Sequence, residues 1–124
     1  MAFWSTFIDS PHELRTRSGD NRDLVFLTGT AGADLTGRGQ TWYRDQVWIP
    51  IGPRWKSLDN VAPMAALAAI SNSHTAVDAG WATDNCNWLN VNGQIVLTVS
   101  LAISDIDGHL IRVSYQATAI GHLN

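Results

Sequence analysis

The chain has a single cysteine, a single lysine and a single glutamate, and it lacks any long hydrophobic run. One cysteine, Cys86, cannot form a disulfide within the chain. A membrane-spanning helix needs about 18 or more consecutive apolar residues, so we expect no membrane span. Residues 1–10 have neither a basic start nor a long apolar segment. This predicts no classical signal peptide and a cytoplasmic protein, or one exported without such a signal.

Positive charge is also scarce and scattered. Eight Lys and Arg against eleven Asp and Glu give a formal net charge of −3. Nucleic acid as a partner is disfavoured, because phosphate contacts need clustered basic side chains. The histidines at 12, 74, 109 and 122 are far apart in the sequence, so we expect no metal site. No cofactor motif is present, and none is expected to bind.

What the chain does contain favours strands and turns. Its charges are almost all Asp and Arg, whereas the helix formers Lys and Glu are nearly absent. Glycine, threonine, valine, isoleucine and tryptophan are common instead. A length of 124 residues fits one hydrophobic core. We therefore expect residues 1–124 to form one β-rich domain.

The clearest strands lie in the last third of the chain. Residues 94–104 alternate apolar and small polar side chains, and residues 109–119 do the same, which is the period of a strand. Asn92-Gly93 is a typical two-residue hairpin turn. It predicts that 81–91 folds back on 94–104, with Trp88 opposite Leu97 and Cys86 opposite Val99.

A second turn is expected at 106–108, ending in Gly108. It would pair Ile103 with Ile111 and Leu101 with Val113 and so keep apolar residues on one face. The segments 81–91, 94–104 and 109–119 thus predict a C-terminal three-stranded meander. The residues predicted to share its buried face on the middle strand are Ile95, Leu97, Val99, Leu101 and Ile103.

The first two thirds of the chain predict further strands at 23–31 and 40–51 and a short one at 3–8. Glycines indicate a loop at 32–39, the polar residues 11–22 indicate a connector, and Pro50 and Pro53 end the 40–51 strand or place it at an edge. Residues 61–70 predict one short helix, with Asn60 as its cap. The expected fold is all-β: an antiparallel β-barrel or β-sandwich with that helix packed on it.

A ligand surface is predicted from the alternation in 40–51. Trp42, Arg44, Gln46 and Trp48 share one face, which combines flat aromatic rings with polar groups. Sugars have C–H faces that stack on indole rings and hydroxyl edges that accept and donate hydrogen bonds. Core packing and a subunit interface would also account for these tryptophans.

The segment 81–92 carries a second group of this kind, in which short amide and carboxylate side chains stand between two tryptophans. The predicted ligand-binding residues are Trp42, Arg44, Trp48, Trp81, Asp84, Asn85, Asn87 and Trp88.

Three functions remain open from the sequence. The first is a carbohydrate-binding, lectin-like module without catalytic residues, for a glycan or another small molecule. The second is a small β-barrel enzyme that acts on an apolar substrate in its interior, with Asp45 and Tyr43 as acid–base groups. The third is a structural or assembly subunit of a homo-oligomer, because a small β domain has sheet edges and surplus tryptophans to cover. The residues favour binding over catalysis.

Overall fold

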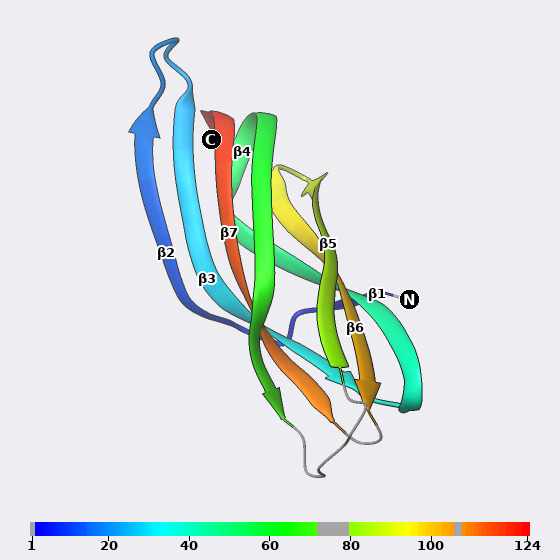
Figure 1. The fold of residues 1–124 in the computed structure, drawn as a ribbon. Coiled ribbons are helices and arrows are strands. Elements are labelled where there is room, and N and C mark those ends of the chain that lie inside the picture. Colours follow the sequence, from blue (N-terminus) through cyan, green and yellow to red (C-terminus); the bar gives the residue numbers. More distant parts are fainter. Residues whose placement is uncertain (1, 72–79, 106–107) are drawn as a thin grey trace.

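The computed structural model describes residues 2–71, 80–105 and 108–124, and this part of the chain consists of strands and their connections (Figure 1). The strands are β1 (Ala2–Trp4), β2 (Ile8–Arg17), β3 (Asp23–Thr36), β4 (Gly39–Ser71), β5 (Gly80–Val91), β6 (Gln94–Asp105) and β7 (His109–Leu123). They form one sheet in the order β2-β3-β7-β4-β6-β5, antiparallel throughout, and β1 adds to β4 in parallel. The predicted all-β, antiparallel fold is confirmed, and the sheet is not closed.

The long strand β4 divides the sheet into two halves. Its residues 39–54 pair with β6 on one side and β1 on the other, whereas residues 55–71 pair with β7. The pairing changes where the register shifts between Ile51 and Arg54, beside Gly52, whose φ of 71° places it in the left-handed region. We call β1, β5, β6 and residues 39–54 the β6 half, and β2, β3, β7 and residues 55–71 the β7 half. Figure 1 shows β4 arching from one to the other.

One hydrophobic cluster contains buried side chains from both halves. The inward side chains of β6 (Ile95, Leu97, Val99, Leu101 and Ile103) are completely buried, as the alternation predicts. They belong to the same cluster as Val25, Leu27, Leu110 and Val113 of the β7 half. The period-two pattern therefore identified the buried face of this strand correctly.

The hairpin of β5 and β6 is confirmed in detail. Asn92 and Gly93 have φ values of 51° and 86°, as a type I′ turn requires at both central positions. Trp88 lies opposite Leu97 and Cys86 opposite Val99. The turn also contacts β4, because the backbone N–H of Trp55 donates to the carbonyl oxygen of Gly93 at 2.7 Å.

The third strand of the predicted meander is wrong. β7 pairs with β3 and β4, and β4 lies between β6 and β7, so Ile103 does not pair with Ile111 and Leu101 does not pair with Val113. Both strands contribute to the same core, and β7 buries the expected face from Val113 to Ala119. At its start the face is reversed, because Leu110 is fully buried and Ile111 is 38% exposed. Alternation specifies which side chains face inward, but it does not specify the neighbouring strand. The turn residues 106 and 107 lie outside the described residues.

The predicted helix at 61–70 is also wrong, because this segment is strand and belongs to β4. Val61, Ala65 and Leu67 pack against the core, while Met64 between them is 64% exposed. The Asn60 side chain accepts a hydrogen bond from the Val61 N–H at 2.9 Å, without a helix to cap. Apolar residues on both faces of this strand satisfy the helical and the strand period alike.

Two segments predicted to lack strands are in fact paired. The polar connector expected at 11–22 contains most of β2, and the loop expected at 32–39 contains the end of β3. Both strands are irregular, with register shifts between Asp9 and His12 and between Gly32 and Leu35. Within the described part of the chain, no helix is long and apolar enough to cross a membrane.

Candidate functional site

The candidate site lies on the outer face of the β6 half. Arg44, Gln46 and Trp48 of β4 lie opposite Ala102, Ser100 and Thr98 of β6, respectively. On the other side of β6, β5 places Asn85 opposite Ser100 and Asn87 opposite Thr98. Two rows of larger side chains therefore flank a central row of small ones, because residues opposite each other in a sheet share a face.

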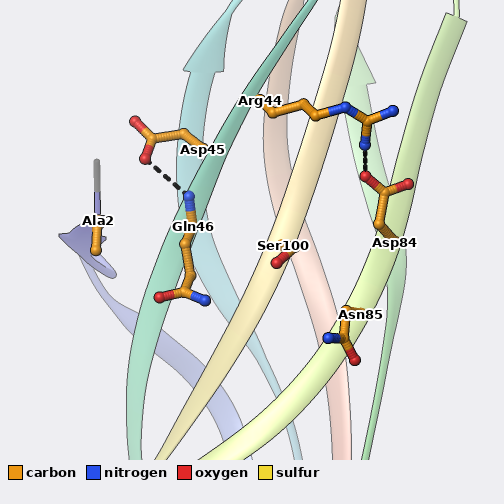
Figure 2. A pocket seen from close by; sticks show the side chains of 7 residues that line it. All are labelled: Ala2, Arg44, Asp45, Gln46, Asp84, Asn85 and Ser100. Carbon is orange, nitrogen blue, oxygen red and sulfur yellow. Dashed lines mark hydrogen bonds and ion pairs between the residues drawn. The ribbon is translucent and has the colours of Figure 1, made fainter.

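A shallow hollow of about 560 Å³ opens over Ser100. It is lined by Ala2, Arg44, Asp45, Gln46, Asp84, Asn85 and Ser100 (Figure 2). The outward side chains of β6 on either side of Ser100 are covered by their neighbours: Thr98 is 7% exposed and Ala102 is 1% exposed. Ser100 is therefore the point where the central strand is open to a ligand.

An ion pair crosses the site. The Arg44 guanidinium on β4 contacts the Asp84 carboxylate on β5, and the pair spans the intervening β6 (Figure 2). The strand register shifts between Thr83 and Asn85, which places the extra residue Asp84 at this point of β5. Both side chains remain partly exposed, at 61% and 37%. Each of the two side chains can therefore form hydrogen bonds with a ligand while it remains in contact with the other.

Gln46 is held by its neighbour on the same strand. The Trp48 indole N–H donates to the Gln46 side-chain oxygen at 2.7 Å, so this oxygen is occupied. In Figure 2 the Gln46 amide nitrogen lies on the side of Ser100. An amide fixed in this way offers two N–H donors to a ligand without losing rotamer freedom on binding.

Aromatic side chains stand at the two ends of the β4 row. The Trp42 ring is 53% exposed and covers Gly80, where a Cβ would approach the ring to 2.8 Å. At the other end, Trp4 of β1 is 54% exposed and meets Trp48 edge to face, with ring centroids 5.3 Å apart. The sequence did not indicate Trp4, because the parallel pairing of β1 with β4 leaves no local pattern.

Trp81 and Trp88 lie on the opposite face of β5. They are opposite Ile103 and Leu97 of β6 and pack against the core. The structure therefore brings six of the eight residues predicted to bind a ligand onto one surface and places these two tryptophans beneath it. In a regular strand, residues 81 and 88 would lie on opposite faces. The extra residue at the register shift, Asp84, brings both tryptophans to the same face.

Tyr43 and Asp45, the acid–base groups of the enzyme alternative, are both half-buried, but Asp45 lines the hollow whereas Tyr43 packs against the core. The Tyr43 hydroxyl donates to the Asp45 carboxylate at 3.3 Å, and the Gln46 backbone N–H donates to the same carboxylate at 2.8 Å. The Arg38 guanidinium stacks on the Tyr43 ring at 3.8 Å from its centroid. Among the described residues, no three His, Cys, Asp or Glu side chains are grouped so that they could hold a metal ion.

Comparisons of the chain with protein-family models, with curated proteins and with solved structures found no match.

Proposed function

We propose that the protein binds carbohydrate, without catalysis, at the outer face of the β6 half. The observation that carries this proposal is the convergence of β4 and β5. Arg44 comes from β4, and Asp84 and Asn85 come from β5, yet all three line one open hollow. The exposed Trp42 ring lies at one end of the β4 row, and the exposed Trp4 ring of β1 packs against the half-buried Trp48 at the other.

The chemistry of the surface suits a sugar. An indole ring offers a flat apolar face for the C–H groups of a pyranose, and amide, carboxylate and guanidinium groups bond its hydroxyls in defined directions. Trp42 and Trp48 are six residues apart, which is about 20 Å along a strand. A site of that length fits a short oligosaccharide better than a single sugar ring.

The charges favour a neutral sugar over an acidic one. Among the described residues, Arg44 is the one cation that lines the hollow, and it is paired with Asp84, while Asp45 adds a further carboxylate. A carboxylated or sulfated sugar would therefore meet no uncompensated positive charge from these residues.

We also propose that the β6 half and the β7 half are the two layers of a β-sandwich. What supports this arrangement is the core, to which strands of both halves contribute.

The test is a glycan array of neutral and acidic oligosaccharides, followed by titration of tryptophan fluorescence with the best neutral oligosaccharide. We expect Trp42→Ala and Asn85→Ala each to weaken binding by about tenfold, because each removes one stacking or hydrogen-bonding group worth about 1.4 kcal/mol. Phe26→Ala is the matched control, since Phe26 is 40% exposed on β3 in the other half.

Absence of any binder on a broad array would refute the proposal. So would a neutral oligosaccharide whose affinity is unchanged in Trp42→Ala and Asn85→Ala but falls in Phe26→Ala. A strong preference for acidic sugars would contradict the argument from the Arg44–Asp84 pair.

A further inference from the structure

The outer face of the β6 half continues onto the N-terminal strand β1. Because β1 pairs in register with β4, Ala2 lies beside Gln46 and Trp4 lies beside Trp48. Ala2 is one of the residues that line the hollow, and it lies on the same side of the hollow as Gln46 (Figure 2). The strand β1 therefore contributes side chains to the surface on which we place the sugar.

The attachment of β1 involves the same segment of β4. Among the described strands, its three residues pair only with residues 46–48. The next residue, Ser5, donates its backbone N–H to the carbonyl oxygen of Trp48 at 2.9 Å. Phe3 turns inward and packs against the core, as the alternation of a strand requires. The part of β4 that β1 orders is thus the part that carries Gln46 and Trp48.

A chain of side-chain contacts runs from β1 to the hollow. The Trp4 ring meets the Trp48 ring edge to face, with centroids 5.3 Å apart and planes at 86°. The Trp48 indole N–H donates to the Gln46 side-chain oxygen at 2.7 Å. An edge-to-face contact favours one orientation of a ring, and the orientation of the Trp48 ring determines where its N–H points. Trp4 is therefore placed to keep that N–H on Gln46.

The bond from Trp48 determines what Gln46 offers a ligand. An indole N–H only donates, so the amide atom that faces it is the oxygen. The NH2 group is left for the ligand, and it donates hydrogen bonds without accepting them. Without this bond the amide would rotate and would lose more rotamer freedom on binding. Held by Trp48, Gln46 selects a sugar oxygen that accepts a hydrogen bond.

We propose that Trp4 is a positioning residue of the sugar site, which holds Trp48 in place and thereby fixes Gln46 as a hydrogen-bond donor to the bound sugar. The inference rests on the proposed function. It differs from a stacking role for Trp4. A ring that only stacks on the sugar acts independently of Gln46, whereas a ring that positions Gln46 has no effect once the Gln46 amide is removed.

A double-mutant cycle separates these two roles, measured by fluorescence titration with the best neutral oligosaccharide. We expect Gln46→Ala to weaken binding about tenfold, through the loss of one hydrogen bond. Trp4→Ala should weaken it about fivefold, because the amide regains rotamer freedom. The double variant should bind as Gln46→Ala does. In the control cycle, the losses of Trp4→Ala and Trp42→Ala should multiply, because Trp42 lies at the other end of the β4 row.

Nuclear magnetic resonance of the indole N–H groups tests the same contacts without a sugar. The Trp48 signal, assigned by its absence in Trp48→Phe, should exchange slowly with water in the wild type. We expect faster exchange in Gln46→Ala and in Trp4→Ala. Trp4→Phe keeps an aromatic ring against Trp48, so it should retain both the slow exchange and the wild-type affinity. Far-UV circular dichroism checks folding, and Trp4→Leu replaces Trp4→Ala if the latter does not fold.

Two results overturn the inference while the proposed function stands. One is an oligosaccharide that binds the wild type and for which the losses of Trp4→Ala and Gln46→Ala multiply. The other is exchange of the Trp48 indole N–H that is unchanged in a folded Trp4→Ala. An affinity of Trp4→Phe as low as that of Trp4→Ala also contradicts the positioning role. Failure of the wild type to bind any sugar refutes the proposed function, and this inference with it.

Discussion

The six tryptophans occupy three kinds of environment: the core, the exposed surface and half-buried positions between the two. Trp55 is 3% exposed and belongs to the core, whereas Trp4 and Trp42 are more than half exposed. Trp48, Trp81 and Trp88 lie between these extremes, each with one side against protein. The number of tryptophans therefore does not indicate a binding surface. The alternation within 40–51 is the better guide to the proposed surface, because it placed Trp42 and Trp48 on one face with Arg44.

Two partly or fully buried side chains, Cys86 and Tyr115, make the stability of the fold depend on pH in the alkaline range. Burial raises the pKa of the Cys86 thiol above its ordinary value of 9.0, and burial raises the pKa of the Tyr115 hydroxyl above 10.0. The folded chain thus holds both protons more tightly than the unfolded chain. The stability that they confer is complete below the ordinary values and is lost as the pH rises through the raised ones.

We expect the free energy of unfolding to fall above about pH 9, as measured by urea denaturation between about pH 7 and about pH 11. Cys86→Ala should remove the part of the decline that begins near pH 9, and Tyr115→Phe the part that begins near pH 10. Equal slopes in the wild type and both variants would show that other groups cause the decline.

At the scale of elements, the structure separates what local sequence specifies from what it does not. The β5–β6 hairpin could be predicted down to the register, because its turn residues and its two alternating faces all lie within the segment 80–105. The partners of β7 could not, since β3 and β4 are distant in sequence. In β4, Ala and Met on the outer face hid the alternation of Val61, Ala65 and Leu67. Arg44, Asp84 and Asn85, which line one hollow, could be selected as candidates from the sequence because each lies in a segment whose own pattern was informative.

The turn at Asn92-Gly93 gives this element a direct test. Gly93 has a positive φ, and a Cβ there would lie 2.6 Å from the carbonyl oxygen of Trp55. We expect Gly93→Ala to lower the free energy of unfolding by about 2 kcal/mol or more, from the left-handed backbone together with the close approach to β4.

Asn92→Gly is the control in the same turn, because glycine adopts the left-handed conformation of Asn92 freely. Urea denaturation of both variants makes the comparison. An equal loss of stability in the two variants would mean that neither the backbone angle of Gly93 nor its close approach to Trp55 causes the loss in Gly93→Ala.

At the scale of the whole molecule, the shared core makes the two halves interdependent. Leu97 of β6 and Val113 of β7 are both fully buried and belong to one cluster. Neither half retains its buried face when the other unfolds. A domain of this size with one core is expected to unfold in a single cooperative step.

We therefore expect tryptophan fluorescence and far-UV circular dichroism to give the same urea midpoint. Five of the six tryptophans are in the β6 half, whereas circular dichroism reports the strands of both halves. Leu97→Ala should lower both midpoints together, at a cost of about 2–5 kcal/mol, and Val113→Ala should do the same with a smaller cost. A fluorescence transition separated from that of circular dichroism, in either variant, would show two independent units.

The continuity of β4 has a consequence for how the molecule would meet a polymer. The row from Trp42 to Trp48 runs along the axis of this strand for about 20 Å. A polysaccharide held as proposed would therefore lie parallel to β4, with its ends free to extend past the sheet. Its affinity would rise with each added sugar unit until the row is filled, and longer chains would gain nothing further.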